Sequence, residues 1–238
     1  MASNDKPVCA VIGIGPKNGA AFSRRFAAEG YAVAMLSRKT DLSSTIASEL
    51  DAAGRGPAKA YACDASSPDA VTTALARVSD DLGPIDTVVY NAGSGSWGNI
   101  EQLSAEQFEQ AWRTNSLGLF AAAKAVIPAM IERGRGNIVV VGATASLRGK
   151  PFTTAFAPAK AAQRSLAQAL ARHLGPKGIH VSLIIIDGGI GDALGAPSAE
   201  PPTQLDPGDI AHAALFLARQ PRSAWTFELD VRPQMESW

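Results

Sequence analysis

The stretch VCAVIGIGPKNGAAFSRRFAAEG, residues 8–30, decides the fold of this chain. Residues 8–14 form a short apolar run rich in Val and Ile, which predicts a buried strand. A glycine-rich turn over residues 13–19 follows, and residues 19–29 carry an apolar helical face. In a strand, glycine turn and helix of this kind, backbone N–H groups and the helix N-terminus can bind a pyrophosphate.

The same alternation of strand and helix continues along the chain. Further strands are expected over residues 32–36, 58–63, 87–90, 137–141, 181–186 and 226–229, and helices over residues 42–53, 68–82, 104–133, 154–174 and 207–218. The helix over 104–133 opens with the capping-box sequence Ser104-Ala105-Glu106-Gln107. The strands are apolar on both faces, as in parallel sheets covered by helices. We predict an α/β fold: a single-domain Rossmann-type doubly wound parallel sheet over residues 1–238, with helices on both faces.

The composition argues against several classes of protein. Lys plus Arg and Asp plus Glu each total 22, so the formal net charge is zero, and no basic stripe indicates binding to nucleic acid or an anionic membrane. No apolar run approaches the roughly 20 residues that span a bilayer, and residues 1–7 lack the apolar segment of a signal peptide. Cys9 and Cys63 do not form a disulfide framework. We expect a cytoplasmic protein with a small-molecule substrate and no metal.

The turn and the end of the second strand indicate the cofactor. The turn residues expected to contact it are Gly13, Gly15, Lys17, Asn18 and Gly19. The second strand ends in Ser37-Arg38, where an NAD site usually places an acid on the ribose 2′-OH. Arg38 supplies a cation instead, and Lys17 is a second cation expected to reach the same phosphate. Two cations and no acid favour a 2′-phosphate and predict NADP(H).

Motifs along nearly the whole chain resemble the short-chain dehydrogenase/reductase family. They are the glycine turn, Asp64-Ala65, Asn91-Ala92-Gly93, Asn115, the frame Phe156-x-x-x-Lys160 and Asp187-Gly188-Gly189. The resemblance implies that Asp64, beside Ala65, meets the adenine ring, and that Asn91, Ala92 and Gly93 pass close to the adenine ribose. It implies that Lys160 binds the nicotinamide ribose beside a water held by Asn115, with Gly188 and Ile190 near the carboxamide. It also implies a homodimer or homotetramer that packs through the last strand and its helix.

The chain departs from the family's pattern in the glycine turn and at the catalytic centre. Lys17 replaces the second glycine of the turn. The family's proton-donating tyrosine, four residues before the lysine, is Phe156 here, and its serine aligns with Ala143. A phenyl ring cannot donate a proton. The alternatives are the hydroxyls of Thr144 and Ser146, which also suit ordinary turn residues, and Lys160 itself, directly or through the water at Asn115.

A missing general acid costs about 10²–10⁴-fold in rate, and less where the acceptor is already activated. We therefore predict an NADP(H)-dependent oxidoreductase that transfers hydride to a small activated carbonyl, imine or conjugated alkene, with Lys160, Asn115 and Thr144 in the catalytic set. The alternative is a catalytically silent NADP(H)-binding sensor or partner subunit.

Aromatic residues and one long loop are expected to shape the substrate site and an interface. Trp97, Phe152 and Phe156 are candidates for a pocket wall that suits a flat or apolar substrate. Residues 188–206, with several Gly and Pro, form either a lid over the substrate or a mobile connection. Trp225 and Trp238 are candidate interface anchors, although Trp225 can equally cover its own core.

Overall fold

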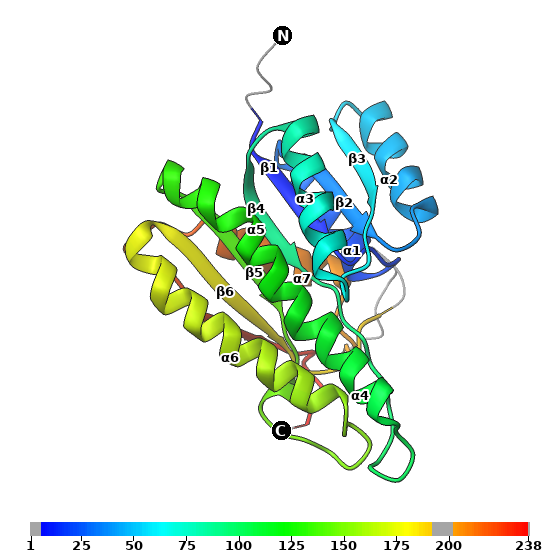
Figure 1. Cartoon of the computed structure of the whole chain (residues 1–238). Coiled ribbons are helices and arrows are strands. Elements are labelled where there is room, and N and C mark those ends of the chain that lie inside the picture. The colour runs from blue at the N-terminus through cyan, green and yellow to red at the C-terminus, as the bar shows by residue number, and fades with distance from the viewer. Residues whose placement is uncertain (1–5, 192–201, 238) are drawn as a thin grey trace.

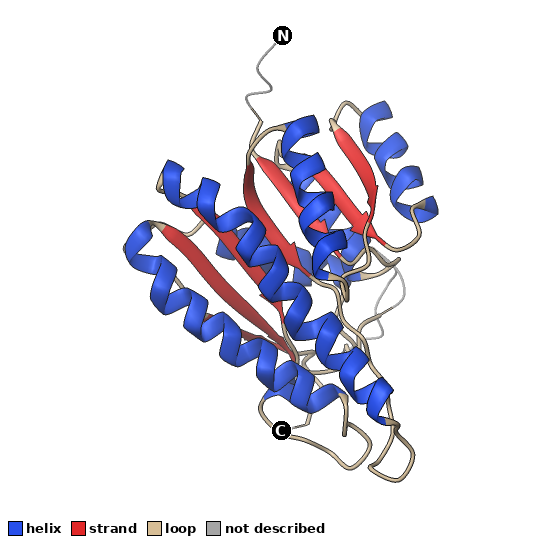
Figure 2. Ribbon diagram, in the orientation of Figure 1, coloured by secondary structure: helices blue, strands red, loops and turns tan. Residues whose placement is uncertain are grey.

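A computed structural model describes residues 6–191 and 202–237, in which seven parallel strands form one sheet (Figure 2). The strands are β1 (Val8–Ile12), β2 (Ala32–Ser37), β3 (Ala58–Ala62), β4 (Ile85–Tyr90), β5 (Gly136–Val141), β6 (Ile179–Ile186) and β7 (Glu228–Val231). The longer helices are α1 (Asn18–Ala28), α2 (Asp41–Ala52), α3 (Pro68–Leu82), α4 (Ala105–Trp112), α5 (Gly118–Arg133), α6 (Phe156–Leu174) and α7 (Pro207–Ala218). The predicted α/β architecture is confirmed.

The strand order is β3-β2-β1-β4-β5-β6-β7. The order reverses between β1 and β4, because the chain runs from β1 outward to β3 and then returns to the other side of β1. Ligands of open parallel sheets bind in the crevice at such a switch point, beyond the carboxyl ends of the strands. The topology therefore places the end of β1, and with it the glycine turn, at the centre of the binding edge.

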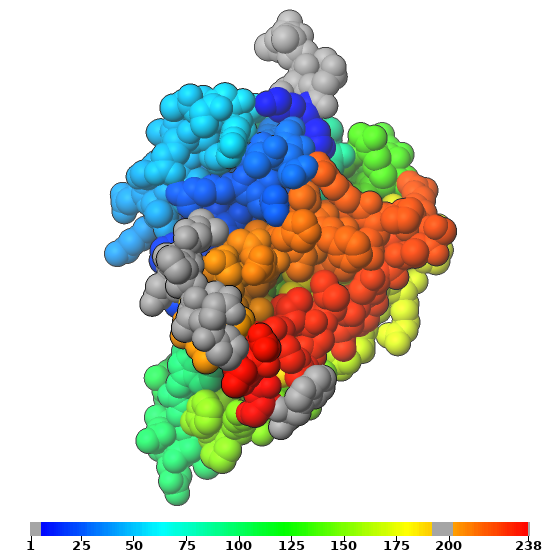
Figure 3. All heavy atoms as spheres, turned by 180° about the vertical axis from the view of Figure 1, so that it is seen from behind, coloured from blue at the N-terminus to red at the C-terminus, as the bar shows by residue number. Residues whose placement is uncertain are grey.

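Helices cover both faces of the sheet. Helices α3, α5 and α6 lie in front of the sheet in Figure 1, and α1, α2 and α7 pack on the opposite face. Figure 3, seen from behind, shows α7 in orange beside α1 in blue. Two apolar cores result: one includes Leu119 and Leu174, and the other includes Phe22 and Phe26. Alternate strand residues enter opposite cores, as a two-sided sheet requires.

The expected long helix over residues 104–133 differs from the prediction in one respect. Its capping box forms, since Ser104 Oγ accepts from the Gln107 N–H and Gln107 Oε1 accepts from the Ser104 N–H. A π-helical turn, η1 (Arg113–Leu117), then separates α4 from α5. Such a turn widens the helix locally and is common at functional sites. Asn115 lies within it and is fully buried.

The continuous helix Ala105–Arg133 is long and apolar enough to meet a length-and-composition test for a membrane span, contrary to the expectation from the sequence. Half of its most apolar window is buried inside the protein, where α5 packs against α3 and the sheet. Core helices of globular proteins share this burial.

Two further expectations concern the C-terminal part. Strand β7 begins at Glu228 instead of Thr226, because the Thr226 backbone bonds to the side chains of Gln220 and His180, and backbone pairing with β6 starts at Glu228. Trp225 stacks on the buried His180 ring at 4.8 Å and donates to the Gln220 carbonyl, so it covers its own core. Trp238 lies outside the described residues, as do residues 192–201 of the loop expected over 188–206.

Candidate active site

A cavity of about 520 Å³ lies at the switch point, beyond the ends of β1, β2 and β4. It brings together most of the residues expected at the cofactor. Those among its lining residues are Gly13, Gly15, Ser37, Arg38, Asp64, Ala65, Asn91, Ala92 and Gly93. They come from the ends of separate strands, so the sheet topology assembles them.

The glycine turn packs closely on the segment after β4. Gly13 has φ of 98°, and a Cβ there would lie 2.5 Å from the Ala92 nitrogen. A Cβ on Gly19 would lie 2.6 Å from the Gly13 carbonyl oxygen. Asn91 Nδ2 donates to that carbonyl at 2.7 Å, which ties the two segments together. Side chains at Gly13 and Gly19 would therefore force the turn away from the sheet.

Two features of the turn leave room and hydrogen-bonding capacity for a ligand. A Cβ on Gly15 would meet no atom within 4 Å, so open space faces the turn there. Asn18, at the start of α1, is buried, and its Oδ1 has no hydrogen-bond partner in the described part of the chain. Buried polar atoms normally have a partner, so this cradle fits a ligand that supplies hydrogen bonds.

The two cations expected at a 2′-phosphate are separated by the structure. Arg38 is exposed at the end of β2 and lines the cavity with Ser37, whose hydroxyl donates to the Lys39 carbonyl. Lys17 is absent from the cavity lining, and its Nζ donates to the Ile190 carbonyl at 2.8 Å. The expectation that both cations reach one phosphate is therefore not supported. Lys17 instead links the glycine turn to the segment after β6.

Asp64 lies opposite Arg38 in the same cavity. Hydrogen bonds from the backbone and hydroxyl of Ser66 lower the pKa of Asp64, and the charges of Arg38 and Arg113 lower it further against the effect of burial. The carboxylate is thus ionised and held in place at the wall where the resemblance locates the adenine ring.

Lys160 lies on α6 behind this cavity and is only 5% exposed. Its Nζ donates to the Val141 carbonyl at 2.9 Å and to Gln163 Oε1 at 3.0 Å. It lies 5.8 Å from the centroid of the Phe156 ring. Burial lowers the pKa of Lys160 to about 7. An ammonium with a pKa near neutrality is suited to proton transfer.

Asn115 and Lys160 meet beside Gly93. A Cβ on Gly93 would lie 3.4 Å from Asn115 Oδ1 and 3.8 Å from Lys160 Nζ. The Asn115 amide donates to the carbonyls of Ser94 and Ala111, and its Oδ1 has no hydrogen-bond partner within the described ranges. A buried, unpartnered acceptor beside an ammonium marks a place for a hydroxyl or a water, which agrees with the role implied for Asn115 by the resemblance.

A second cavity of about 310 Å³ is lined by Phe156 of α6 and by the segments that follow β5 and β6. Its wall contains Trp97, Phe152 and Phe156, with ring centroids 5.9 Å apart for Trp97 and Phe152 and 4.9 Å for Trp97 and Phe156. The three rings thus line one cavity, as expected, and the assignment of this cavity to the substrate stays a prediction. Ala143 also lines this cavity, so neither Ala143 nor Phe156 presents a hydroxyl to it.

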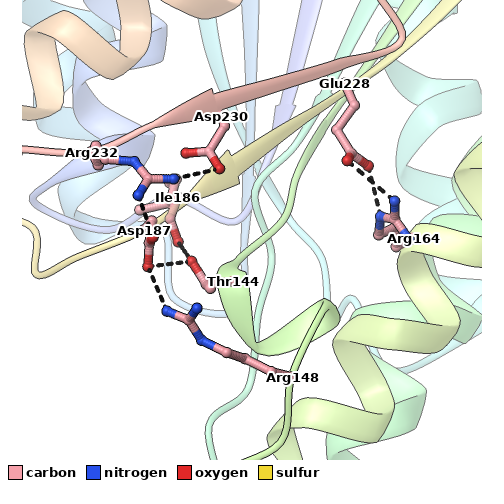
Figure 4. A network of polar contacts seen from close by, with 8 residues as sticks. All are labelled: Thr144, Arg148, Arg164, Ile186, Asp187, Glu228, Asp230 and Arg232. Carbon is pink, nitrogen blue, oxygen red and sulfur yellow. Dashed lines mark hydrogen bonds and ion pairs between the residues drawn. The ribbon is translucent and has the colours of Figure 1, made fainter. Parts of the chain in front are cut away.

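Thr144 lines the second cavity, but its hydroxyl has a definite partner. It donates to Asp187 Oδ1 at 2.6 Å and lies 3.2 Å from the Ile186 carbonyl (Figure 4). A hydroxyl has one proton to donate, so Thr144 can only accept a hydrogen bond from a molecule in the cavity. Ser146 lies outside the lining of this cavity, and its buried Oγ has no hydrogen-bond partner among the residues described.

The polar network around Asp187 was not anticipated from the sequence. Two arginines form ion pairs with Asp187: Arg232 at 3.4 Å and Arg148 at 3.8 Å. Arg232 also pairs with Asp230 (Figure 4). The network fastens the end of β6 to β7 and to the segment after β5. Gly188, with φ of 136°, lines the second cavity directly after it. Ile190 pairs with Leu205 and lies opposite Lys17.

Gln163 is a second feature that the sequence analysis missed. It is fully buried and bonds to both Lys160 and the Asn115 backbone. The sequence signal that could have indicated Gln163 is its position three residues after Lys160, on the same buried face of the helix. No cluster of three or more His, Cys, Asp or Glu side chains suited to a metal occurs across residues 6–191 and 202–237.

Known proteins are similar to this chain in sequence and in architecture. The family model described as short chain dehydrogenase matches residues 8–192. The inactive 2-(S)-hydroxypropyl-CoM dehydrogenase 2 of Xanthobacter autotrophicus is 30% identical over 204 residues, covering 79% of this chain and 87% of that protein. A short-chain dehydrogenase from Rhodopseudomonas palustris is 34% identical, with 95% and 98% of the two chains covered and a TM-score of 0.83. A metagenomic blue fluorescent protein in complex with NADPH is 29% identical, with 97% and 98% covered and a TM-score of 0.85.

Proposed function

Since the chain belongs to the short-chain dehydrogenase/reductase family, we propose that it is an NADP(H)-dependent oxidoreductase. Its substrate is a small molecule with an activated carbonyl, an imine or a conjugated alkene that accepts hydride. The observation that carries the proposal is the buried Lys160 ammonium 5.8 Å from the Phe156 ring, together with the absence of a hydroxyl at Phe156 and Ala143 in the second cavity.

Residues of the first cavity hold the cofactor in this proposal. Arg38 pairs with the 2′-phosphate, because a guanidinium forms forked hydrogen bonds with phosphate oxygens. The open space at Gly15 and the N-terminus of α1 receive the pyrophosphate. The neighbour that binds NADPH supports this assignment. Asp64 and Ala65 receive the adenine, Asn91, Ala92 and Gly93 its ribose, and Gly188 and Ile190 the carboxamide.

The proposed catalytic groups are Lys160 and Asn115, beside Gly93 of the first cavity, and Thr144 of the second cavity. Reduced nicotinamide supplies hydride, and the chain must orient the acceptor and provide the proton. Phe156 and Trp97 form a wall against which a flat acceptor packs. Lys160 binds the nicotinamide ribose together with Asn115 Oδ1, and its ammonium is the proton source. Thr144 and Asp187 also line the second cavity. Because Thr144 donates its proton to Asp187, it can only accept a hydrogen bond from the substrate.

This proposal predicts a preference among acceptors. Anaerobic mixing of the protein and NADPH with enones, quinones, cyclic imines and simple ketones should show the activated acceptors reduced at least about 100-fold faster, since they depend less on a general acid. Because the protonated form of Lys160 is lost as pH rises through about 7, enone and quinone reduction should slow above that pH. Lys160→Met removes this ammonium and serves as the control, in which the slowing above about pH 7 should be absent. Equal rates for simple ketones would refute the proposal.

A catalytically silent NADP(H)-binding protein is the second candidate. Two observations favour it: the absence of a hydroxyl at Phe156, and the 30% identical relative whose own name describes it as inactive. In this case the protein binds NADPH tightly but reduces none of the acceptors. The same mixing experiment, combined with a binding titration, separates the two candidates.

The family commonly forms oligomers, and we propose a homodimer or homotetramer. β7 is the edge strand of the described sheet, and Phe216 on the neighbouring α7 is 54% exposed. Phe108 on α4 and Phe120 on α5 are 45% and 49% exposed on the other face. Both free thiols are buried, which favours a reducing compartment such as the cytoplasm.

Charges introduced at these side chains should dissociate the oligomer. Phe216→Glu combined with Phe108→Glu should shift the mass measured by light scattering to that of the monomer, because a buried unpaired carboxylate opposes association. Leu42→Glu on α2 makes the same change at an exposed apolar residue beside β3, at the edge of the sheet opposite β7, and should leave the mass unchanged. An unaltered mass in the double variant would contradict the proposed interfaces.

A further inference from the structure

Gln163 joins the two elements that carry Lys160 and Asn115. It is fully buried on α6, one turn beyond Lys160. Its Oε1 accepts from Lys160 Nζ at 3.0 Å, and its Nε2 donates to the Asn115 backbone carbonyl at 3.0 Å. Ser116 in the same π-helical turn donates to the Ala159 carbonyl at 2.9 Å. The π-helical turn is thus fastened to α6 on both sides of the lysine.

The orientation of the Gln163 amide follows from its partners. An ammonium only donates and a backbone carbonyl only accepts. The amide oxygen must therefore face Lys160 and the amide nitrogen must face Asn115. Reversal would leave two buried groups without partners, which is costly in a dry environment. Gln163 consequently offers Lys160 one fixed acceptor.

Lys160 has two such acceptors, Gln163 Oε1 and the Val141 carbonyl. A charged lysine has three N–H protons, and the neutral amine keeps two. The two fixed acceptors are therefore satisfied in both protonation states. The third proton is the one that can leave without breaking a hydrogen bond to the protein. Nζ lies near Gly93, which lines the first cavity, and near Asn115 Oδ1, which has no hydrogen-bond partner among the described residues.

We propose that Gln163 is a positioning residue that fixes Lys160 as a proton donor with one transferable proton. This inference rests on the proposed reductase function. In the step, hydride from NADPH forms a C–H bond at the acceptor carbon, and the π electron pair moves to the acceptor oxygen. That oxygen takes the third proton of Lys160, which leaves a neutral amine and NADP⁺. A proton from solvent then restores the ammonium.

Among the described residues, Gln163 supplies the side-chain acceptor of the Lys160 ammonium, and the Val141 backbone supplies the other. Facing groups are the Val141 carbonyl from β5, Asn115 from the π-helical turn, Gly93 after β4, and Phe156 and Gln163 from α6. Burial lowers the pKa of Lys160, and no carboxylate or second cation of the described residues contributes. Asp187, across the second cavity, pairs with Arg148 and Arg232.

Two substitutions of opposite electrostatic effect test the role. Gln163→Met keeps the unbranched shape but removes the acceptor, so it should lower the pKa of Lys160 by about one unit. Gln163→Glu places a carboxylate beside the ammonium and should raise that pKa by more than one unit. In the profile of activity against pH, the pH above which activity falls should be lower in Gln163→Met and higher in Gln163→Glu. Neither should change the KM for NADPH more than about threefold.

A readout independent of turnover keeps this inference separate from the proposed function. Titration of ¹³C-labelled lysine in the NADP⁺-saturated protein, with Lys160 identified by its loss in Lys160→Met, reports the pKa directly. Gln168→Met, at a half-buried amide on α6 outside both cavities, is the matched control and should leave the pKa unchanged. Opposite shifts without any acceptor reduction would remove the reductase proposal but retain Gln163 as the group that sets the lysine. Unmoved pKa values in both variants, with thermal stability lowered, would overturn the inference and leave Gln163 a structural residue.

Discussion

The double variant Phe156→Tyr/Ala143→Ser should reduce simple ketones about 10²–10⁴-fold faster than the natural chain, because a positioned general acid contributes that much to rate. Phe156 and Ala143 line the same cavity, so both new hydroxyls enter it. The Lys160 ammonium lies 5.8 Å from the Phe156 ring and would favour the ionised phenol, which lowers its pKa. Steady-state rates with a panel of unactivated ketones at saturating NADPH measure the gain.

Phe152→Tyr is the matched control for this gain of function. It adds a phenol to the same aromatic wall, but Phe152 is not on α6 with Lys160. We expect no increase in ketone reduction from it. If the double variant stays inactive while still binding NADPH, the site lacks more than its hydroxyls. If the natural chain reduces activated acceptors and the double variant loses that activity, the natural site is specialised and not merely degenerate.

Arg38→Glu should weaken NADPH binding by about 100-fold and leave NADH binding equal or tighter. The loss follows from a charge-assisted hydrogen bond of about 1.5–3 kcal/mol, converted at 1.4 kcal/mol per tenfold in affinity. The introduced carboxylate also repels the 2′-phosphate and is able to accept from a ribose hydroxyl, as acids do at this position in NAD sites. Fluorescence titrations with the two reduced cofactors give both affinities.

Arg172→Glu provides the control for the change of net charge. It lies near the far end of α6, is exposed and lines neither cavity. Its NADPH affinity should match that of the natural chain. Equal loss of NADPH and NADH affinity in Arg38→Glu would indicate a damaged cavity instead of a lost phosphate contact. Lys17→Ala should leave the ratio of the two affinities unchanged, since Lys17 is directed at Ile190.

Much of the cofactor site was predictable because it depends on local rules. A glycine turn between a buried strand and a helix has one dominant geometry, and strand ends of a parallel sheet meet at one edge. Gly13, Gly15, Asp64, Asn91 and their neighbours therefore meet in one cavity as expected. Phe156 and Lys160 are four residues apart on a helix, so they likewise lie side by side on one helix face. The aromatic wall needed only the additional expectation that Trp97 follows a strand end.

Other parts of the site depended on which groups meet across the fold. Lys17 and Arg38 are both cations near the cofactor edge, yet the path of the chain after β6 brings the Ile190 carbonyl to Lys17 and leaves Arg38 at the cavity. From the sequence, the Thr144 hydroxyl could equally have donated to a substrate, but in the structure it donates to Asp187 Oδ1 at 2.6 Å. A hydroxyl or ammonium donates to the nearest available acceptor, and that acceptor came from a distant part of the chain.

The sequence by itself determined the doubly wound sheet, the cofactor edge and the absence of a hydroxyl at Phe156 and Ala143, because strand and helix periodicity and side-chain chemistry are local properties. The tertiary structure alone decided how Lys160 is held. Gln163 and the Asn115 carbonyl are 48 positions apart, and they pair because a π-helical turn and α6 pack together in the interior. Buried polar groups must find partners, and packing decides which partners are within reach.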